Sequence, residues 1–222
     1  MFSVLLWLVA TFLLCCDGRK RPRHMPATVF GRPFGGFLDH SDVHKFAAPT
    51  VLNDQVKKGV VYQSVDHFDP LNMFSWKQHY LYNMQFYNGS GLVFCMIGGE
   101  SKISYKWIAD TSYMWLVWAK KYKAAAFLPE HRFYGDSHPK RDMSTASYQY
   151  FTIEQALADL RNFILNINEE FFPNVKTRWI LFGGSYPGSL SAWFRAQNPD
   201  ITIGSISSSA GMHTQLDYYR KF

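Results

Sequence analysis

The chain has 222 residues, of which 47% are hydrophobic and 18% aromatic, and 23 basic against 17 acidic residues give a net charge of +6. This composition excludes an intrinsically disordered chain, and the absence of a fixed repeat or heptad run excludes solenoids and coiled coils. Four of the cations lie between Arg19 and Arg23, and without them the positive and negative residues nearly balance. The charge is a local cluster, so we expect no nucleic-acid partner.

The chain begins with an almost unbroken apolar run from Phe2 to Leu14, followed by the small residues Cys16 and Gly18. The run is shorter than the roughly 20 residues that span a bilayer, and it fits the core of a signal peptide, roughly 7–15 residues. We therefore expect a signal peptide over residues 1–18, a secreted or lysosomal protein, and no membrane anchor after cleavage. Asn88 opens an Asn-Gly-Ser sequon and is a candidate glycosylation site.

Residues 19–58 are rich in proline, glycine, histidine and charge, which is typical of an extended N-terminal segment or a propeptide. From residue 59 to residue 222, short apolar segments typical of strands alternate with segments of helical periodicity. The expected strands are Val60–Val65, Trp76–Phe86, Leu92–Ile97, Ala124–Leu128, Trp179–Phe182 and Ile203–Ile206. The expected helices are Ile108–Tyr122, Thr152–Phe171 and Leu190–Gln197. This alternation predicts an α/β fold with a mostly parallel sheet, flanked by helices and entered through an antiparallel hairpin.

Once the signal peptide is removed, Cys95 is the single cysteine of the chain. Neither a disulfide framework nor a zinc pattern can be built from it, and we expect no metal and no cofactor. Its apolar neighbours predict a buried thiol, and pairing with a cysteine outside this sequence stays open.

The segment from Trp179 to Gly188 carries the chemistry. A buried strand runs into Gly183 and Gly184, then Ser185, then a segment of helical character. This context predicts a nucleophile elbow, a sharp turn that exposes a serine hydroxyl to a general base. The strict Gly-x-Ser-x-Gly pattern fails because Pro187 stands two residues after the serine, and a glycine-rich turn with an incidental serine is the alternative.

An elbow serine needs backbone donors for the oxyanion of the tetrahedral intermediate. The amide of Tyr186 is one candidate, and the amide of Gly99, in the loop after the strand Leu92–Ile97, is the other. Glu100 in the same loop either binds the amino terminus of a substrate or is a structural carboxylate.

Five motifs in this order resemble the S28 family of serine peptidases, and most closely its thymus-specific branch. The motifs are Tyr62-Gln63 with Asp66-His67-Phe68, Gly98-Gly99-Glu100, Glu130 to Gly135, Glu154 to Leu160, and Phe182 to Tyr186. The resemblance implies an α/β-hydrolase core, a helical cap domain and a Ser–Asp–His triad that cleaves peptides, typically after proline and near a chain end. It implies peptide substrates, with a homodimer as the candidate assembly. Ser101 and Pro187 depart from the family pattern.

The triad of this fold follows the order serine, acid, histidine, and only 37 residues follow Ser185. Asp200 and His213 have the right order, but the resemblance places the acid and base downstream of this chain, beyond a helical insertion. His67 and His131 are expected to be structural. The chain therefore resembles the N-terminal portion of a serine exopeptidase, post-proline or dipeptidyl-type, with its helical cap absent or truncated. The 222-residue form is expected to be inactive alone. The alternative function is an inactive secreted fragment or binding protein on the same fold.

Overall fold

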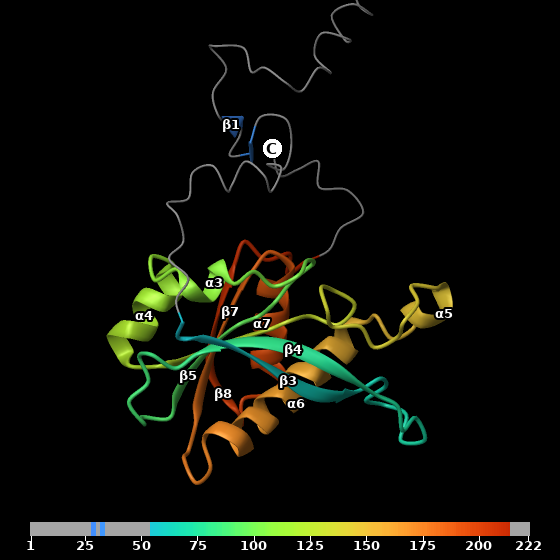
Figure 1. Ribbon diagram of the computed structural model, residues 1–222. Coiled ribbons are helices and arrows are strands. Elements are labelled where there is room, and N and C mark those ends of the chain that lie inside the picture. Colours follow the sequence, from blue (N-terminus) through green and yellow to red (C-terminus); the bar gives the residue numbers. More distant parts are fainter. Residues whose placement is uncertain (1–27, 30–31, 34–53, 214–222) are drawn as a thin grey trace, which may run out of the picture. The chain divides into compact units, whose positions relative to one another are not determined.

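The computed structural model describes residues 28–29, 32–33 and 54–213 of the chain (Figure 1). The expected signal peptide and most of the expected N-terminal segment lie outside the described residues. The chain divides into two compact units, residues 1–49 and 50–222. In the first unit, β1 (Thr28–Val29) pairs antiparallel with β2 (Arg32–Pro33).

The second unit is built on a six-stranded sheet with the order β3-β4-β6-β5-β7-β8. The strands are β3 (Val56–Ser64), β4 (Ser75–Asn83), β5 (Leu92–Met96), β6 (Ala125–Pro129), β7 (Arg178–Gly184) and β8 (Thr202–Ser208). β3, β4 and β6 pair antiparallel, whereas β6, β5, β7 and β8 pair parallel. The expected entry hairpin and mostly parallel sheet are confirmed, and β3 begins at Val56, inside the segment expected to be extended.

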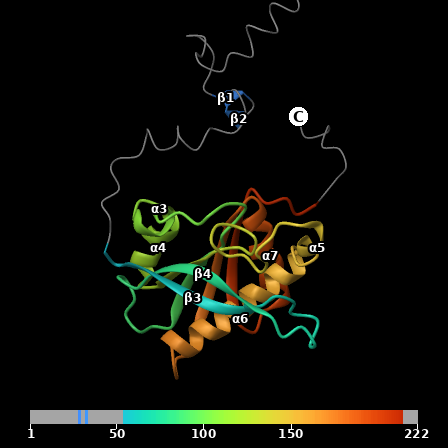
Figure 2. The same cartoon turned by 45° about the vertical axis from the view of Figure 1, so that its right-hand side comes forward.

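Helices cover both faces of this sheet, as Figures 1 and 2 show. They are α3 (Lys106–Ala109), α4 (Met114–Tyr122), α5 (Thr145–Tyr148), α6 (Ile153–Phe171) and α7 (Tyr186–Gln197). α6 and α7 pack on one face in a core that includes Phe127, Phe163 and Trp179. α3 and α4 pack on the other face, around Leu116 and Phe182. The fold class is α/β, and its strand order, with antiparallel β4 and parallel β6 to β8, is that of an α/β-hydrolase core.

The amphipathic stripe expected of α6 lies inside, because Leu157, Leu160, Phe163, Ile164 and Ile167 are buried. Such a helix is stabilised chiefly by packing its apolar face on the sheet. The two central strands of the sheet are β6 and β5. The Cys95 thiol is free and fully buried in β5, where burial raises its pKa. The expected buried thiol is confirmed.

The helix expected over Ile108–Tyr122 is wrong in its first third. The chain forms the short helix α3, turns at Asp110, and starts α4 at Met114. The Asp110 carboxylate accepts hydrogen bonds from the backbone N–H (3.0 Å) and the hydroxyl (2.7 Å) of Ser112. Such local side-chain bonds compete with helical backbone bonds and break the helix there.

Candidate active site

Ser185 lies at the sharp turn between β7 and α7, with backbone angles φ 59° and ψ −129°. A non-glycine residue at positive φ costs of order 1–3 kcal/mol and persists only where the surrounding structure holds it. Two backbone bonds hold it here, because Ser185 N–H donates to the Ser208 carbonyl (2.9 Å) and Ser189 N–H donates to the Ser185 carbonyl (3.2 Å). The residue is exposed, so the turn presents its side chain to solvent.

The hydroxyl of Ser185 is not used for helix capping. A serine at this position usually accepts a hydrogen bond from an amide in the first helical turn, but here no such bond forms. Pro187, in that first turn, has no N–H to offer. Within the part of the chain that the structure describes, the Ser185 oxygen therefore stays available for chemistry.

Gly183 allows the strand and the helix to approach closely at this turn. A side chain there would overlap the backbone of Pro187 and Gly188. Gly188 is confined in the same way, since an added Cβ would lie 3.1 Å from both the Gly183 and the Ser208 carbonyl oxygens. The close approach of strand and helix at this turn therefore requires glycine at position 183.

Both candidate oxyanion donors lie beside this turn. Tyr186 is the first residue of α7, and the first amides of a helix have no intrahelical acceptor. A Cβ added to Gly99 would lie 2.7 Å from the Pro187 Cγ atom, so the Gly99 loop contacts the first turn of α7. Neither amide donates a hydrogen bond within residues 54–213. Pro187, which departs from the family pattern, thus serves as the packing partner of Gly99.

Glu100 is exposed at the same edge of the sheet and forms no ion pair with a described residue. Its negative charge adds to burial in raising the pKa of the Tyr134 phenol, and it also acts on the Tyr186 phenol, whose pKa is raised to about 12 by burial and by Tyr134. The carboxylate is therefore close enough to the residue after Ser185 to attract a cation bound there.

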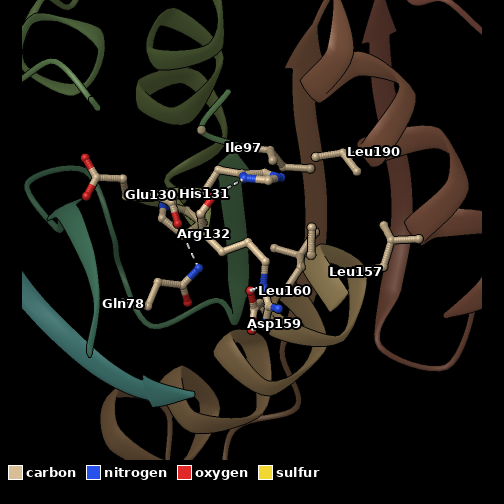
Figure 3. A pocket seen from close by; sticks show the side chains of 12 residues that line it. Gln78, Ile97, Glu130, His131, Arg132, Leu157, Asp159, Leu160 and Leu190 are labelled. Atoms are coloured by element: carbon tan, nitrogen blue, oxygen red, sulfur yellow. Dashed lines mark hydrogen bonds and ion pairs between the residues drawn. The ribbon is translucent and has the colours of Figure 1, made fainter. Parts of the chain in front are cut away.

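His131 lies between Ile97 and Leu190, and both residues line the same pocket as His131 (Figure 3). Its Nδ1 is 2.7 Å from the Arg132 carbonyl oxygen, and its Nε2 is 3.1 Å from the Tyr186 hydroxyl. A carbonyl only accepts, so Nδ1 carries the proton and Nε2 accepts from the phenol. Burial lowers the pKa of His131, which keeps the ring neutral. With both nitrogens engaged, His131 is structural, as expected.

A buried polar network connects motifs that are far apart in the chain. The guanidinium of Arg132 is fully buried and donates to both Asp159 carboxylate oxygens, from Nε at 2.6 Å and from Nη2 at 2.8 Å. Its Nη1 donates to the Tyr150 carbonyl (2.7 Å) and the Val65 carbonyl (3.3 Å). His67 Nε2 lies 2.7 Å from Asp159 Oδ1, so His67 is structural as well. The network fixes β6 and α6 against the β3–β4 connection.

Sequence reasoning missed this network. Thr152 and Gln155 have the spacing of a capping box at the start of α6, and only half of the box forms: the Thr152 hydroxyl accepts from Gln155 N–H at 3.2 Å. The Gln155 side chain instead donates to Asp66 (2.6 Å) and accepts from His67 N–H (3.0 Å). The residues in these contacts are almost 90 positions apart. The only sequence feature that linked them was that their motifs occur together, in the order found in the S28 family.

Asp200 does not reach Ser185. It follows the C-terminal end of α7 and pairs with Arg161 (2.9 Å), whereas Ser185 precedes the N-terminal end. The 12 residues of α7 span about 18 Å. A local triad of Ser185, Asp200 and His213 is therefore excluded. Among the described residues no group of acidic, cysteine and histidine side chains could hold a metal ion, and no helix has the length and apolar character to cross a membrane.

Comparison with known proteins identifies the family. The family model of serine carboxypeptidase S28 matches residues 63–222. The chain belongs to the S28 family. The lysosomal Pro-X carboxypeptidases of Mus musculus and Homo sapiens are 37% and 34% identical to it, over 78% and 83% of the chain. The Caenorhabditis elegans protein F56F10.1 is 49% identical over 71% of the chain. The resemblance found in the five motifs is confirmed.

This S28 chain spans about a third of its relatives, covering 29% of the Caenorhabditis elegans protein, 36% of the mouse enzyme and 38% of the human enzyme. Among solved structures, the Pyrococcus furiosus esterase Pf2001 is similar over 71% of the chain and 50% of the esterase, with a TM-score of 0.47 and 14% identity.

Proposed function

We propose that the protein is a serine exopeptidase that cleaves peptides and uses Ser185 as its nucleophile. The observation that carries the proposal is the backbone of Ser185, an exposed serine at positive φ between β7 and α7. The Ser185 Oγ attacks the scissile carbonyl, a base takes the hydroxyl proton, and the proton passes to the leaving amine. Water then hydrolyses the acyl-enzyme and regenerates the serine.

The amides of Tyr186 and Gly99 are the proposed oxyanion donors. Tyr186 N–H opens α7, where the helix dipole also favours negative charge. Gly99 packs on Pro187 and brings its loop to the same turn. The acid and the base are assigned to a segment downstream of Phe222, because the S28 relatives are about three times as long. His67 Nε2 is bound to Asp159 and both ring nitrogens of His131 are engaged, so neither histidine is proposed as the base.

Glu100 is the proposed anchor for the amino terminus of a substrate. Its exposed carboxylate has no cationic partner within residues 54–213, and it acts on the phenols of Tyr134 and Tyr186 beside the nucleophile. An ammonium group held there favours cleavage of the dipeptidyl type. The names of the mouse and human relatives support a preference for proline and a lysosomal or secretory location.

A fluorophosphonate probe tests the nucleophile in the protein expressed from its complete coding sequence. We expect the wild type to be labelled and Ser185→Ala to be unlabelled. Ser209→Ala is the matched control, because Ser209 is also exposed and also has positive φ (50°), but lies after β8 rather than before a helix. Equal labelling of wild type and Ser185→Ala refutes the proposal.

The role of Glu100 is tested with one peptide in two forms, with a free and with an acetylated amino terminus. Glu100→Gln should raise KM for the free form and leave KM for the acetylated form unchanged, because only the ammonium group loses its partner. An equal effect on both forms assigns Glu100 a structural role instead.

A further inference from the structure

The first turn of α7 holds two features of the proposed chemistry, the strained Ser185 and the Tyr186 amide. Both depend on how firmly this turn is fixed, since a misplacement of about 1 Å can cost about 10²-fold in rate. Within the described part of the chain, the side chain of Tyr186 makes one hydrogen bond, from its hydroxyl to His131 Nε2. This bond joins the turn to the segment that follows β6.

His131 is itself fixed from three directions. Its Nδ1–H donates to the Arg132 carbonyl, and the rings of Tyr134, Phe151 and Tyr186 lie edge-on at 5.5–5.9 Å. The residue is only 6% exposed, so these contacts hold its ring within the protein. Protonation would add a charge in this apolar contact, and burial opposes it by lowering the pKa.

The next residue, Arg132, extends this support into the core. Its guanidinium donates hydrogen bonds to the Asp159 carboxylate. It also donates to carbonyl oxygens of the β3–β4 connection and of the segment before α6. Figure 3 shows the two side chains diverging from adjacent positions, His131 toward Leu190 of α7 and Arg132 toward Asp159 of α6. The carbonyl that accepts the His131 hydrogen bond therefore belongs to Arg132, whose side chain is fixed by a buried ion pair with Asp159.

We propose that His131 is a positioning residue that holds the Tyr186 amide in place through the Tyr186 hydroxyl. The inference rests on the proposed function, because the amide matters only if Ser185 is a nucleophile. His131 does not touch the substrate and transfers no proton. It acts on the rate of the covalent step and leaves the binding of the substrate unchanged.

The test measures fluorophosphonate labelling of the full-length protein, separated into the maximal rate kinact and the concentration dependence KI. Tyr186→Phe removes the hydroxyl alone. His131→Asn keeps a donor near Nδ1 and loses the group that reaches the phenol. Each should lower kinact about ten-fold, less than the roughly 10²–10³-fold loss when an oxyanion donor is deleted, and should leave KI within about two-fold.

Three further variants sharpen the result. The double variant Tyr186→Phe/His131→Asn should be no slower than either single variant, because both remove the same bond. His131→Gln, whose amide reaches the Nε2 position, should recover part of the rate. Tyr148→Phe is the matched control, since Tyr148 belongs to the same aromatic cluster but contacts Phe133 and Phe151 rather than His131.

Wild-type kinact in Tyr186→Phe overturns the inference, as does a double variant whose loss is the product of the two single losses. Thermal unfolding of each variant checks that it is folded. If His131→Asn is not folded, the kinact of Tyr186→Phe alone tests the inference. Labelling of Ser185→Ala would refute the proposed function itself, so the two failures are distinguishable.

Discussion

Replacing Arg132 with methionine should be among the most damaging single changes to the stability of this fold. The guanidinium is fully buried, and its loss leaves the Asp159 carboxylate, which is 2% exposed, with His67 as its remaining side-chain partner. Breaking a buried ion pair from one side costs about 3–5 kcal/mol, against a total stability of about 5–15 kcal/mol for a domain. With a urea m-value of about 2 kcal/mol/M, the unfolding midpoint should fall by about 2 M.

Urea unfolding of the full chain, followed by tryptophan fluorescence, measures this effect. Arg161→Met is the matched control, because Arg161 pairs with Asp200 at the surface, where the two side chains are 42% and 55% exposed. Its loss should cost about 1–2 kcal/mol, because the surface ion pair contributes little and Arg161 Nη1 also donates a hydrogen bond to the buried Asn198 side chain (2.6 Å). The unfolding midpoint of Arg132→Lys should lie between those of Arg132→Met and Arg161→Met, since lysine keeps the charge but cannot form the two parallel hydrogen bonds of a guanidinium. If Arg132→Met unfolds within 0.5 M (about 1 kcal/mol) of Arg161→Met, the network does not stabilise the fold as argued.

Three other predictions concern the site and its surroundings. Gly99→Ala should slow labelling of Ser185 about ten-fold, because the new methyl group meets the Pro187 ring and displaces the loop; unchanged labelling contradicts this contact. Because burial lowers the folded pKa of His131 below 6.5, its contribution to stability is present above pH 6.5 and is lost as the pH falls through the folded pKa. The free energy of unfolding should therefore depend less on acid pH in His131→Asn, and an identical pH dependence would exclude a neutral buried ring. Asn88 is exposed in a turn, so secreted protein should lose mass on N-glycan removal, and Asn88→Gln should not.

The sheet and its long helix could be predicted from the sequence because their signals are local. Continuous apolar runs gave β5, β6 and β7, and a 3.6-residue periodicity gave α6, all within a few residues of their bounds. The turn at Ser185 was also local, since strand, glycines and helix are contiguous. Whether Ser185 is a nucleophile stays a prediction.

The errors arose where distant contacts or side-chain bonds decide the structure. The side chain of Asp110 ends α3 early, although the apolar pattern continues into α4. The Gln155 side chain forms its hydrogen bonds with the β3–β4 connection rather than with the N-terminus of its own helix. The partnership of His131 with Tyr186 spans 55 positions, and no spacing rule connects the two residues.

The contact between Gly99 and Pro187 makes these two positions interdependent. An added Cβ on one side lies 2.7 Å from the ring on the other, so a larger residue at position 99 is tolerated only if the ring is removed. Gly99→Ala/Pro187→Gly should then label faster than Gly99→Ala alone. A homologue that carries glycine two residues after its serine is free to vary at the facing loop, whereas this chain must keep its smallest residue there.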